Sequence, residues 1–301
     1  MAVRKSVSEL DALLLELHAL ADRVAAAETG DDVRKTKRAR LTLDEITRRL
    51  SAAAEELDPI LRPTSIFDPS APNTAGRVVA LTLVAQPRHP LSEIPDFYGA
   101  GVYAIYYRGD FVPYRLLSNT DHPIYVGQAA PDEASAKDAV GQGTKLSARL
   151  REHARNIRKV DSTLNISDFE CRFLIVQSGF QTSAENYLIN FFRPIWNAET
   201  KVCFGLGKHG DSSDTRANKR SPWDTLHPGR TWAESTVIDQ KPYEQIVEQI
   251  AAHLEVNKPY KDIHEIFDRF MVDMRQVDSD RFYTATKKDI VIEESAESTL
   301  V

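Results

Sequence analysis

The sequence predicts an α+β protein in which a small, mainly antiparallel sheet is flanked by helices. Residues 101–107 and 123–128 are short runs of apolar, aromatic and β-branched side chains, and each includes a glycine, which is typical of strands with a close backbone approach. Residues 146–157 and 185–192 carry apolar side chains at helical spacing, and the apolar run at residues 169–176 predicts a third strand. The order strand, strand, helix, strand, helix indicates a sheet with helices packed against it.

Length and composition are those of an ordinary globular protein. The chain has 301 residues, of which 42% are hydrophobic and 27% charged, and this suggests one large or two modest domains. Its two cysteines, Cys171 and Cys203, form neither a disulfide framework nor a metal-binding spacing, which fits a reducing cytoplasm. No apolar run is long enough to span a membrane, and acidic residues interrupt the N-terminal segment where a signal peptide would be apolar. We therefore expect a cytoplasmic protein with no membrane partner.

Charge is distributed unevenly along the chain. The formal net charge of −6 by itself argues against a general nucleic-acid binder. Residues 145–159 nevertheless carry many basic side chains against Glu152 alone, whereas acidic residues dominate from residue 289 onward. The net charge can therefore conceal a basic surface that contacts nucleic acid.

Residues 1–63 are predicted to form a helical hairpin ahead of the sheet. Leucines at helical spacing and two capping boxes predict one helix over residues 6–28 and another that starts at Thr42 and ends before Pro59; the capping boxes are Ser6 with Glu9 and Thr42 with Glu45. Residues 34–40 are basic and precede the second helix, so they are either a solvated surface or a contact with DNA phosphates. The hairpin is a candidate for DNA contacts or for a dimer interface.

Residues 64–235 are predicted to form the central domain. Residues 64–73 are rich in proline, serine and aspartate and indicate a linker, and the valine- and leucine-rich residues 77–85 predict a strand. We expect loops over residues 87–95, 129–143 and 201–230, the last of them long and polar. Residues 236–286 are predicted to hold two C-terminal helices, at 242–254 and 262–274, and residues 287–301 an acidic, disordered tail.

The central domain carries several motifs in a fixed order. They are Gly101-Val102-Tyr103, Tyr125-Val126-Gly127, the helical pair Arg149 and His153, Glu185 on the second helix, and Asn197 beyond Pro194. Together these motifs resemble the GIY-YIG nuclease superfamily, over roughly residues 76–234. The arginine followed four residues later by histidine is similar to the type II restriction endonuclease branch of that superfamily.

The resemblance implies a Mg²⁺-dependent endonuclease that cuts double-stranded DNA at a short, specific palindrome, with Mn²⁺ able to substitute. Relatives in this branch favour GC-rich palindromes, use a single metal ion without a covalent intermediate, and leave 5′-phosphate and 3′-hydroxyl ends. A palindrome is read most simply by a homodimer. A DNA methyltransferase is expected to accompany the enzyme in the cell, because cutting the host's own DNA is lethal.

The resemblance also implies a role for each motif residue. Tyr103 would be the general base toward water, and His153 would take its proton, since a free tyrosine has a pKa of about 10 and histidine titrates near neutrality. Arg149 would hold the scissile phosphate and neutralise developing charge. Tyr125 would donate a hydrogen bond to that phosphate or orient the water, and Glu185 would hold the metal ion.

Three further residues refine this assignment. Asn197 would brace the site by hydrogen bonds. Gln128 stands where many superfamily members carry lysine, which makes His153 more important here. Tyr107 faces the same side of the strand as Tyr103, but the motif alignment favours Tyr103.

Basic residues outside the motifs are candidates for DNA contacts. On the first helix of the core they are Lys145, Arg151, Arg155 and Arg158, and in the long loop they are Lys208, Arg216, Lys219, Arg220 and Arg230. Arginine and lysine side chains in a loop of this kind can bind guanine edges in the major groove.

Other interpretations remain open. Taken singly, each motif residue has a structural explanation: Tyr103 and Tyr125 as core aromatics, Glu185 as a capping residue, Asn197 as a turn residue. A repair or homing nuclease of the same superfamily would share the site. A PD-(D/E)xK nuclease would have to use Asp132 with residues 170–172, which lack the lysine. A catalytically inactive DNA-binding protein is the alternative from another class, and a cleavage assay separates it from the nucleases.

Overall fold

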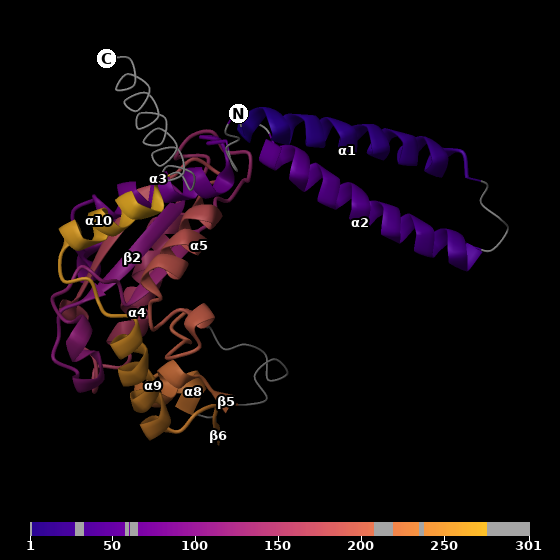
Figure 1. Ribbon diagram of the computed structural model, residues 1–301. Helices are drawn as coiled ribbons and strands as arrows, with labels where there is room; N and C mark the ends of the chain where they lie inside the picture. The colour runs from indigo at the N-terminus through magenta and orange to yellow at the C-terminus, as the bar shows by residue number, and fades with distance from the viewer. Residues whose placement is uncertain are drawn as a thin grey trace, which may run out of the picture. The chain divides into compact units, whose positions relative to one another are not determined.

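The computed structural model describes residues 2–27, 33–57, 60, 66–207, 219–234 and 238–275 (Figure 1). The chain divides into two compact units, Met1–Thr64 with Thr284–Val301 and Ser65–Tyr283. The predicted acidic tail at residues 287–301 lies outside the described residues. Within the described part, no helix has both the length and the apolar character needed to cross a membrane.

The first unit contains two long helices, α1 (Ala2–Ala25) and α2 (Val33–Leu57). The second helix begins well before Thr42, so the expected start was wrong and the basic residues 34–40 lie within α2. Residues 33–57 contain neither glycine nor proline, and nothing in them interrupts a helix. The supposed capping box is used differently: Thr42 Oγ1 donates to the Arg38 carbonyl one turn earlier (3.1 Å), and Glu45 pairs with Arg48 (2.7 Å).

The second unit is built on a four-stranded antiparallel sheet in the order β1-β4-β2-β3. The strands are β1 (His89–Pro90), β2 (Gly101–Tyr107), β3 (Tyr125–Ala129) and β4 (Phe169–Ile175). All of β2 is buried, which follows from its central place between β3 and β4. The prediction of a small, mainly antiparallel sheet flanked by helices is confirmed.

The two faces of β2 belong to different parts of the core. Because successive side chains alternate, Tyr103, Ile105 and Tyr107 face one apolar cluster, and Val102, Ala104 and Tyr106 face the other. The first cluster includes side chains of α4 (Lys145–Arg158) and α9 (Tyr243–Val256). The second includes side chains of α3 (Pro72–Val84), α5 (Gln181–Phe192) and α10 (Ile263–Asp273). Tyr103 therefore points toward α4, the helix that carries Arg149 and His153.

The strand predicted at residues 77–85 is wrong, because this segment belongs to helix α3. Its buried residues, Gly76, Ala80, Leu83 and Val84, recur at helical spacing, and Pro72 starts the first turn. Gly76 lets α3 approach α5 closely, since a Cβ there would lie 2.8 Å from the Ser183 carbonyl carbon. Burial against α5 thus outweighs the preference of valine for strands.

Short elements occupy several segments that were expected to be loops. Residues 87–95 contain β1 at the sheet edge and the 3₁₀ helix η1 (Leu91–Glu93). Three more 3₁₀ helices are η2 (Val112–Leu117), η3 (Ile166–Asp168) and η4 (Ala198–Thr200). The segment 201–230 is packed where it is described: it contributes β5 (Lys219–Arg220) and α7 (Pro222–Leu226), followed by α8 (Thr231–Glu234), and β5 pairs in parallel with β6 (Ile238–Asp239). Its residues 208–218 lie outside the described residues.

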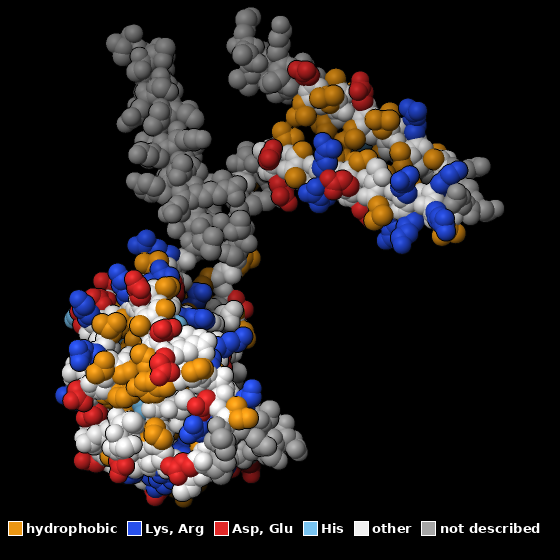
Figure 2. Space-filling view, turned by 90° about the horizontal axis from the view of Figure 1, so that it is seen from below, with side chains coloured by type: hydrophobic (Ala, Val, Ile, Leu, Met, Phe, Trp, Pro, Cys, Tyr) orange, Lys and Arg blue, Asp and Glu red, His pale blue; other side chains and the backbone are white. Residues whose placement is uncertain are grey.

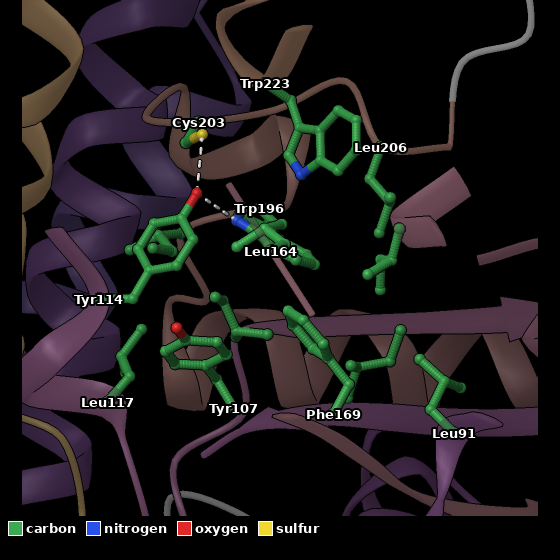
Figure 3. Close-up of a cluster of buried hydrophobic side chains, with 14 of the residues drawn as sticks. Leu91, Tyr107, Tyr114, Leu117, Leu164, Phe169, Trp196, Cys203, Leu206 and Trp223 are labelled. Carbon is green, nitrogen blue, oxygen red and sulfur yellow. Dashed lines mark hydrogen bonds between the residues drawn. The ribbon is translucent and has the colours of Figure 1, made fainter. Parts of the chain in front are cut away.

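This C-terminal part packs on the first cluster through aromatic side chains. Figure 3 shows Tyr114, Trp196, Trp223 and Cys203 on one side of Tyr107 and Phe169. Trp196 and Trp223 meet edge to face, with ring centroids 5.9 Å apart. The elements after residue 200 therefore extend the core that supports the motif strands.

Candidate active site

The two motif glycines allow the strands to come together around Tyr103. In the sheet register, Tyr103 lies opposite Gly127 of β3. A Cβ at Gly127 would collide with the Tyr103 hydroxyl and lie 2.6 Å from its Cζ, so only glycine lets the phenol ring cross over β3. A Cβ at Gly101 would collide with the Leu174 carbonyl of β4. The motifs Gly101-Val102-Tyr103 and Tyr125-Val126-Gly127 thus lie on two strands that pair directly with each other.

Tyr103 and His153 form a buried hydrogen-bonded pair. The Tyr103 hydroxyl oxygen lies 2.7 Å from His153 Nε2, and both side chains are fully buried. His153 sits on the same side of α4 as the core residue Leu150, and this placement directs its ring at β2. Tyr125 joins them, with its ring centroid 5.1 Å from His153 and 6.1 Å from Tyr103.

Arg149 lies one helical turn before His153, at the border between core and solvent. Its side chain is 32% exposed, and Nη1 donates to Glu152 Oε2 at 2.9 Å. The backbone of Gly207 lies against it, since a Cβ at that position would be 3.0 Å from Arg149 Nη2 and 3.8 Å from the Tyr125 hydroxyl. Arg149 also lines a cleft of about 370 Å³ together with Gln128 of β3. The guanidinium is therefore held by Glu152 and the Gly207 backbone and is accessible from the cleft.

Asn197 holds the second motif strand by its backbone. Its Oδ1 accepts from the Val126 N–H (3.0 Å), and its Nδ2 donates to the Val126 carbonyl (2.9 Å). Val126 stands between Tyr125 and Gly127, and the Asn197 side chain is buried. A side-chain amide that satisfies both backbone groups of one residue fixes the position of that residue and its neighbours. The geometry suits a bracing residue.

Glu185 is a half-buried carboxylate on α5. Burial raises the pKa of the Glu185 carboxyl above its ordinary value, contacts with Gln128 act against this rise, and Glu199 adds to it. Thr182 Oγ1 donates to Gln128 Oε1 at 3.2 Å, which ties the start of α5 to β3. A bound cation would relieve the unfavourable burial of this negative charge.

The donor set fits Mg²⁺ better than a closed structural metal site. Among the described residues, no three or more histidine, cysteine, aspartate and glutamate side chains gather as a metal-binding group. Mg²⁺ is commonly held by one or two carboxylates while it keeps several waters and contacts a substrate phosphate. A single carboxylate at Glu185, which interacts with Gln128 of the cleft that Arg149 lines, is consistent with that arrangement.

The environment of the tyrosines favours their neutral form. Burial raises the pKa of Tyr103 well above its ordinary value, Tyr125 raises it further, and Arg149 acts in the opposite direction. Burial also raises the pKa of Tyr125, again opposed by Arg149. A persistent tyrosinate is therefore disfavoured, and Tyr103 can accept a proton only as it passes its own to a partner. His153 is within hydrogen-bonding distance for that purpose.

The other tyrosines of β2 are engaged elsewhere. The Tyr107 hydroxyl accepts from the Phe111 N–H at 2.8 Å, and the Tyr106 hydroxyl accepts from Arg172 at 3.1 Å on the opposite face of the sheet. These contacts separate Tyr103 from the two residues that compete with it in the sequence.

The basic residues of α4 fall into two groups. Lys145 and Arg155 are exposed and line the same cleft as Arg149, and Lys145 pairs with Asp132 (2.6 Å). Arg151 instead pairs with Asp96, and Arg158 donates to the Ser92 carbonyl at 3.0 Å. Only the first group is placed beside the candidate site.

The basic residues expected in the long loop are placed differently from one another. Lys219 is exposed, and Arg220 pairs with Asp239 (2.6 Å). Lys208 and Arg216 lie outside the described residues. The expectation that Arg230 contacts DNA was wrong. Its side chain is 1% exposed, and its Nε donates to the equally buried Asp224 at 2.7 Å.

Arg230 instead holds a segment of the site that the sequence did not reveal. Its Nη1 and Nη2 donate to the carbonyls of Leu206 (3.0 Å) and Gly205 (2.9 Å), and Asn156 of α4 donates to the Leu206 carbonyl as well (3.2 Å). These bonds fix the backbone that places Gly207 against Arg149. No local pattern predicts this arrangement, because it joins three distant parts of the chain.

Comparison with known protein families gives one clear result. The family model described as the Eco29kI GIY-YIG domain matches residues 95–254, more than half of the 301-residue chain. The match begins just before β2, ends within α9 and includes all six motif side chains discussed above, while α1, α2 and α3 lie outside it. No curated protein matches the chain significantly.

Proposed function

This chain belongs to the Eco29kI GIY-YIG family, a family of type II restriction endonucleases, and from that premise we propose that it is a Mg²⁺-dependent enzyme that cuts double-stranded DNA at one short palindrome. The palindrome is GC-rich, and the products carry 5′-phosphate and 3′-hydroxyl ends. The observation that carries the proposal is the 2.7 Å contact between the Tyr103 hydroxyl and His153, one helical turn from Arg149. Arg149 lines a cleft together with the basic residues Lys145 and Arg155.

The proton relay starts at the attacking water. Tyr103 accepts a proton from the water while its own hydroxyl proton moves to His153 Nε2, so no tyrosinate accumulates. The raised pKa of Tyr103 supports this concerted order, because burial disfavours the isolated anion. General base catalysis of this kind contributes about 10²- to 10⁴-fold to a rate.

The remaining residues stabilise the charge that develops on the phosphate. Arg149 binds the non-bridging oxygens, and Glu152 and the Gly207 backbone limit the orientations of its guanidinium. Tyr125 donates a hydrogen bond to the same phosphate. Asn197 holds β3 so that Tyr125 stays in place. Electrostatic preorganisation of this type is commonly the largest single contribution to catalysis.

Glu185 would hold the metal ion, with Mn²⁺ able to replace Mg²⁺. When bound, the ion supplies positive charge for the phosphate and for the leaving 3′-oxygen. Two copies of the chain would read the two halves of the palindrome, and a methyltransferase of the same specificity would protect the host DNA.

Cleavage of unmethylated DNA of diverse sequence tests the proposal. We expect discrete fragments whose ends share one sequence, formed with Mg²⁺ and absent with EDTA or in the Glu185→Ala variant. Glu244→Ala, on the exposed surface of α9, is the matched control and should cut normally. Fragments without a common end sequence would favour a repair nuclease, and cutting only at one long, asymmetric sequence would favour a homing nuclease. Tight DNA binding by folded protein without any cleavage would overturn the proposal in favour of an inactive DNA-binding protein.

A further inference from the structure

The helices α1 and α2, which lie outside the family match, carry apolar residues at alternating spacings of three and four. In α1 the series is Leu10, Leu13, Leu17, Leu20 and Val24, and in α2 it is Leu43, Ile46, Leu50, Ala53 and Leu57. A series with this alternation forms a narrow stripe that packs against other helices in coiled coils and bundles. We refer to these ten residues as the seam.

The seam is largely uncovered in the single chain. Leu13 and Leu20 of α1 are 57% and 51% exposed, and Leu50 of α2 is 41% exposed. No described residue of α2 is buried. Figure 2 shows apolar side chains along this unit. A long helix that leaves such a stripe in water gains stability when a partner covers it.

The charges of α2 indicate which partner fits. Its N-terminal half is basic, with Arg34, Lys35, Lys37, Arg38 and Arg40, and its C-terminal end carries Glu55 and Glu56. In the middle, Glu45 pairs with Arg48 and neutralises it. Helix α2 is therefore self-complementary: a copy turned end for end brings its acidic end to the basic half of the first. A DNA partner would contact the basic half but would leave the leucines of the seam in water.

We propose that α1 and α2 form a dimerisation element, in which the seams of two copies pack into an antiparallel four-helix bundle. A two-fold axis relates the copies, so both chains contribute the same seam residues to the interface. The inference gives the dimer of the proposed enzyme a location, yet it does not depend on the catalytic chemistry. The oligomeric state can be measured without DNA or metal, so failure of the dimerisation proposal is distinguishable from failure of the proposed nuclease activity.

The test uses the full chain in sedimentation experiments over a range of concentrations. We expect a dimer for the wild type and a monomer for the Leu20→Glu/Leu50→Glu variant, with the dimer dissociation constant raised about 100-fold or more. Both leucines are exposed in the single chain, so the thermal unfolding of the second unit should be unchanged. Leu15→Glu is the matched control, because Leu15 is 72% exposed and lies off the seam. It should remain dimeric.

Charge-reversal variants distinguish the antiparallel dimer from other partners of α2, such as DNA. Lys37→Glu/Arg38→Glu and Glu55→Lys/Glu56→Lys should each weaken the dimer alone, and a mixture of the two variants should form mixed dimers. A monomeric wild type, or a dimer that survives the seam substitutions, would overturn the inference. The inference would also be overturned if the Lys37→Glu/Arg38→Glu variant remained dimeric and lost only affinity for DNA. That result would assign the basic half to phosphate contacts.

Discussion

Two buried tyrosine–histidine pairs lie in the second unit and have nearly the same geometry. The Tyr103 hydroxyl is 2.7 Å from His153 Nε2, and the Tyr114 hydroxyl is 2.6 Å from His227 Nε2. All four side chains are fully buried. What differs is the surroundings, and this difference separates a pair suited to move protons from one suited to hold the fold together.

The further hydrogen-bond partners of the Tyr114–His227 pair are neutral side chains. Trp196 Nε1 donates to the Tyr114 hydroxyl (2.9 Å), and Thr163 Oγ1 lies 2.9 Å from His227 Nδ1 (Figure 3 shows the Tyr114 side of this group). Burial lowers the pKa of His227 to about 3, and the nearby charge of Arg230 adds to the effect. This histidine therefore stays neutral at any pH near neutrality.

The Tyr103–His153 pair lies beside charged groups and a cleft. Arg149 is one turn from His153 and borders the cleft, and Glu185 is close enough to influence the pKa of Tyr103. The hydrogen bond alone therefore does not define a catalytic pair. Function follows from the charges next to it and from the route by which a substrate reaches it.

The largest contrast is expected when each tyrosine loses its hydroxyl. Tyr103→Phe should lower the DNA cleavage rate by about 10²- to 10⁴-fold, because the water loses its proton acceptor. Tyr114→Phe is the control and should leave the rate per folded molecule unchanged. Single-turnover cleavage with the folded fraction measured by circular dichroism gives both numbers. Equal losses in the two folded variants would remove the distinction between the pairs.

The same two variants should rank in the opposite order for stability. Tyr114→Phe deprives both Trp196 Nε1 and His227 Nε2 of a buried partner, and we expect it to lower the free energy of unfolding by about 1–3 kcal/mol. Tyr103→Phe should cost less, since it removes the hydrogen bond to His153, whereas Tyr114→Phe removes those to both Trp196 and His227. Urea unfolding at neutral pH measures both changes. A larger loss for Tyr103→Phe would contradict this ranking.

Lowering the pH should destabilise the folded protein because the pKa of His227 is low. Between about pH 6.5 and 3, the unfolded chain binds a proton at His227 that the folded chain refuses, so the free energy of unfolding falls as the pH falls. The slope contributed by one such histidine reaches about 1.4 kcal/mol per pH unit. His122, whose pKa burial also lowers to about 3, adds a second contribution of the same sign.

The variant His227→Gln isolates the first contribution, because a glutamine side chain can still bond to Tyr114 but does not titrate. Urea unfolding between pH 5 and 6.5 should show a shallower dependence on pH in this variant than in the wild type. An unchanged slope would mean that His227 is not excluded from protonation in the folded state.

The sequence allows the first pair to be anticipated but not the second. Tyr103, Arg149 and His153 belong to local motifs on short elements, and the spacing of four places both helical residues toward β2. Tyr114 and His227 belong to no motif, and they meet only because α7 and the residues around it pack on η2 and β2. Partnerships between distant segments leave no local pattern to read.

The errors about the fold have the same origin. The local composition of residues 77–85 favours a strand, but packing against α5 makes them a helix. A basic residue in a polar segment suggests a surface contact, but Arg230 is buried with Asp224. In the first case a long-range contact outweighs a local preference of about 1 kcal/mol. In the second, the Leu206 and Gly205 carbonyls that help to bury Arg230 come from more than 20 residues away and leave no sign in the local composition.

The smallest effect is expected where the two regions are connected. Arg230 lies over the Trp223 ring, 4.6 Å from its centroid, and binds the carbonyls that place Gly207 against Arg149. In Gly207→Ala the new methyl group would sit 3.0 Å from Arg149 Nη2, so the guanidinium must shift by a few tenths of an ångström. We expect cleavage to slow by about 10-fold with unchanged stability, because small displacements of a phosphate-binding group lower the rate steeply.

Gly141→Ala is the control, since a Cβ there meets only ordinary contacts, the nearest at 3.4 Å, in the exposed loop before α4. Single-turnover rates of the two variants at saturating DNA separate a positioning effect from weaker binding. If Gly207→Ala cuts as fast as Gly141→Ala, the segment 205–207 supports the fold but does not orient Arg149. If it is slower and the defect persists at saturating DNA, the enclosed region acts on the site through the backbone that Arg230 holds.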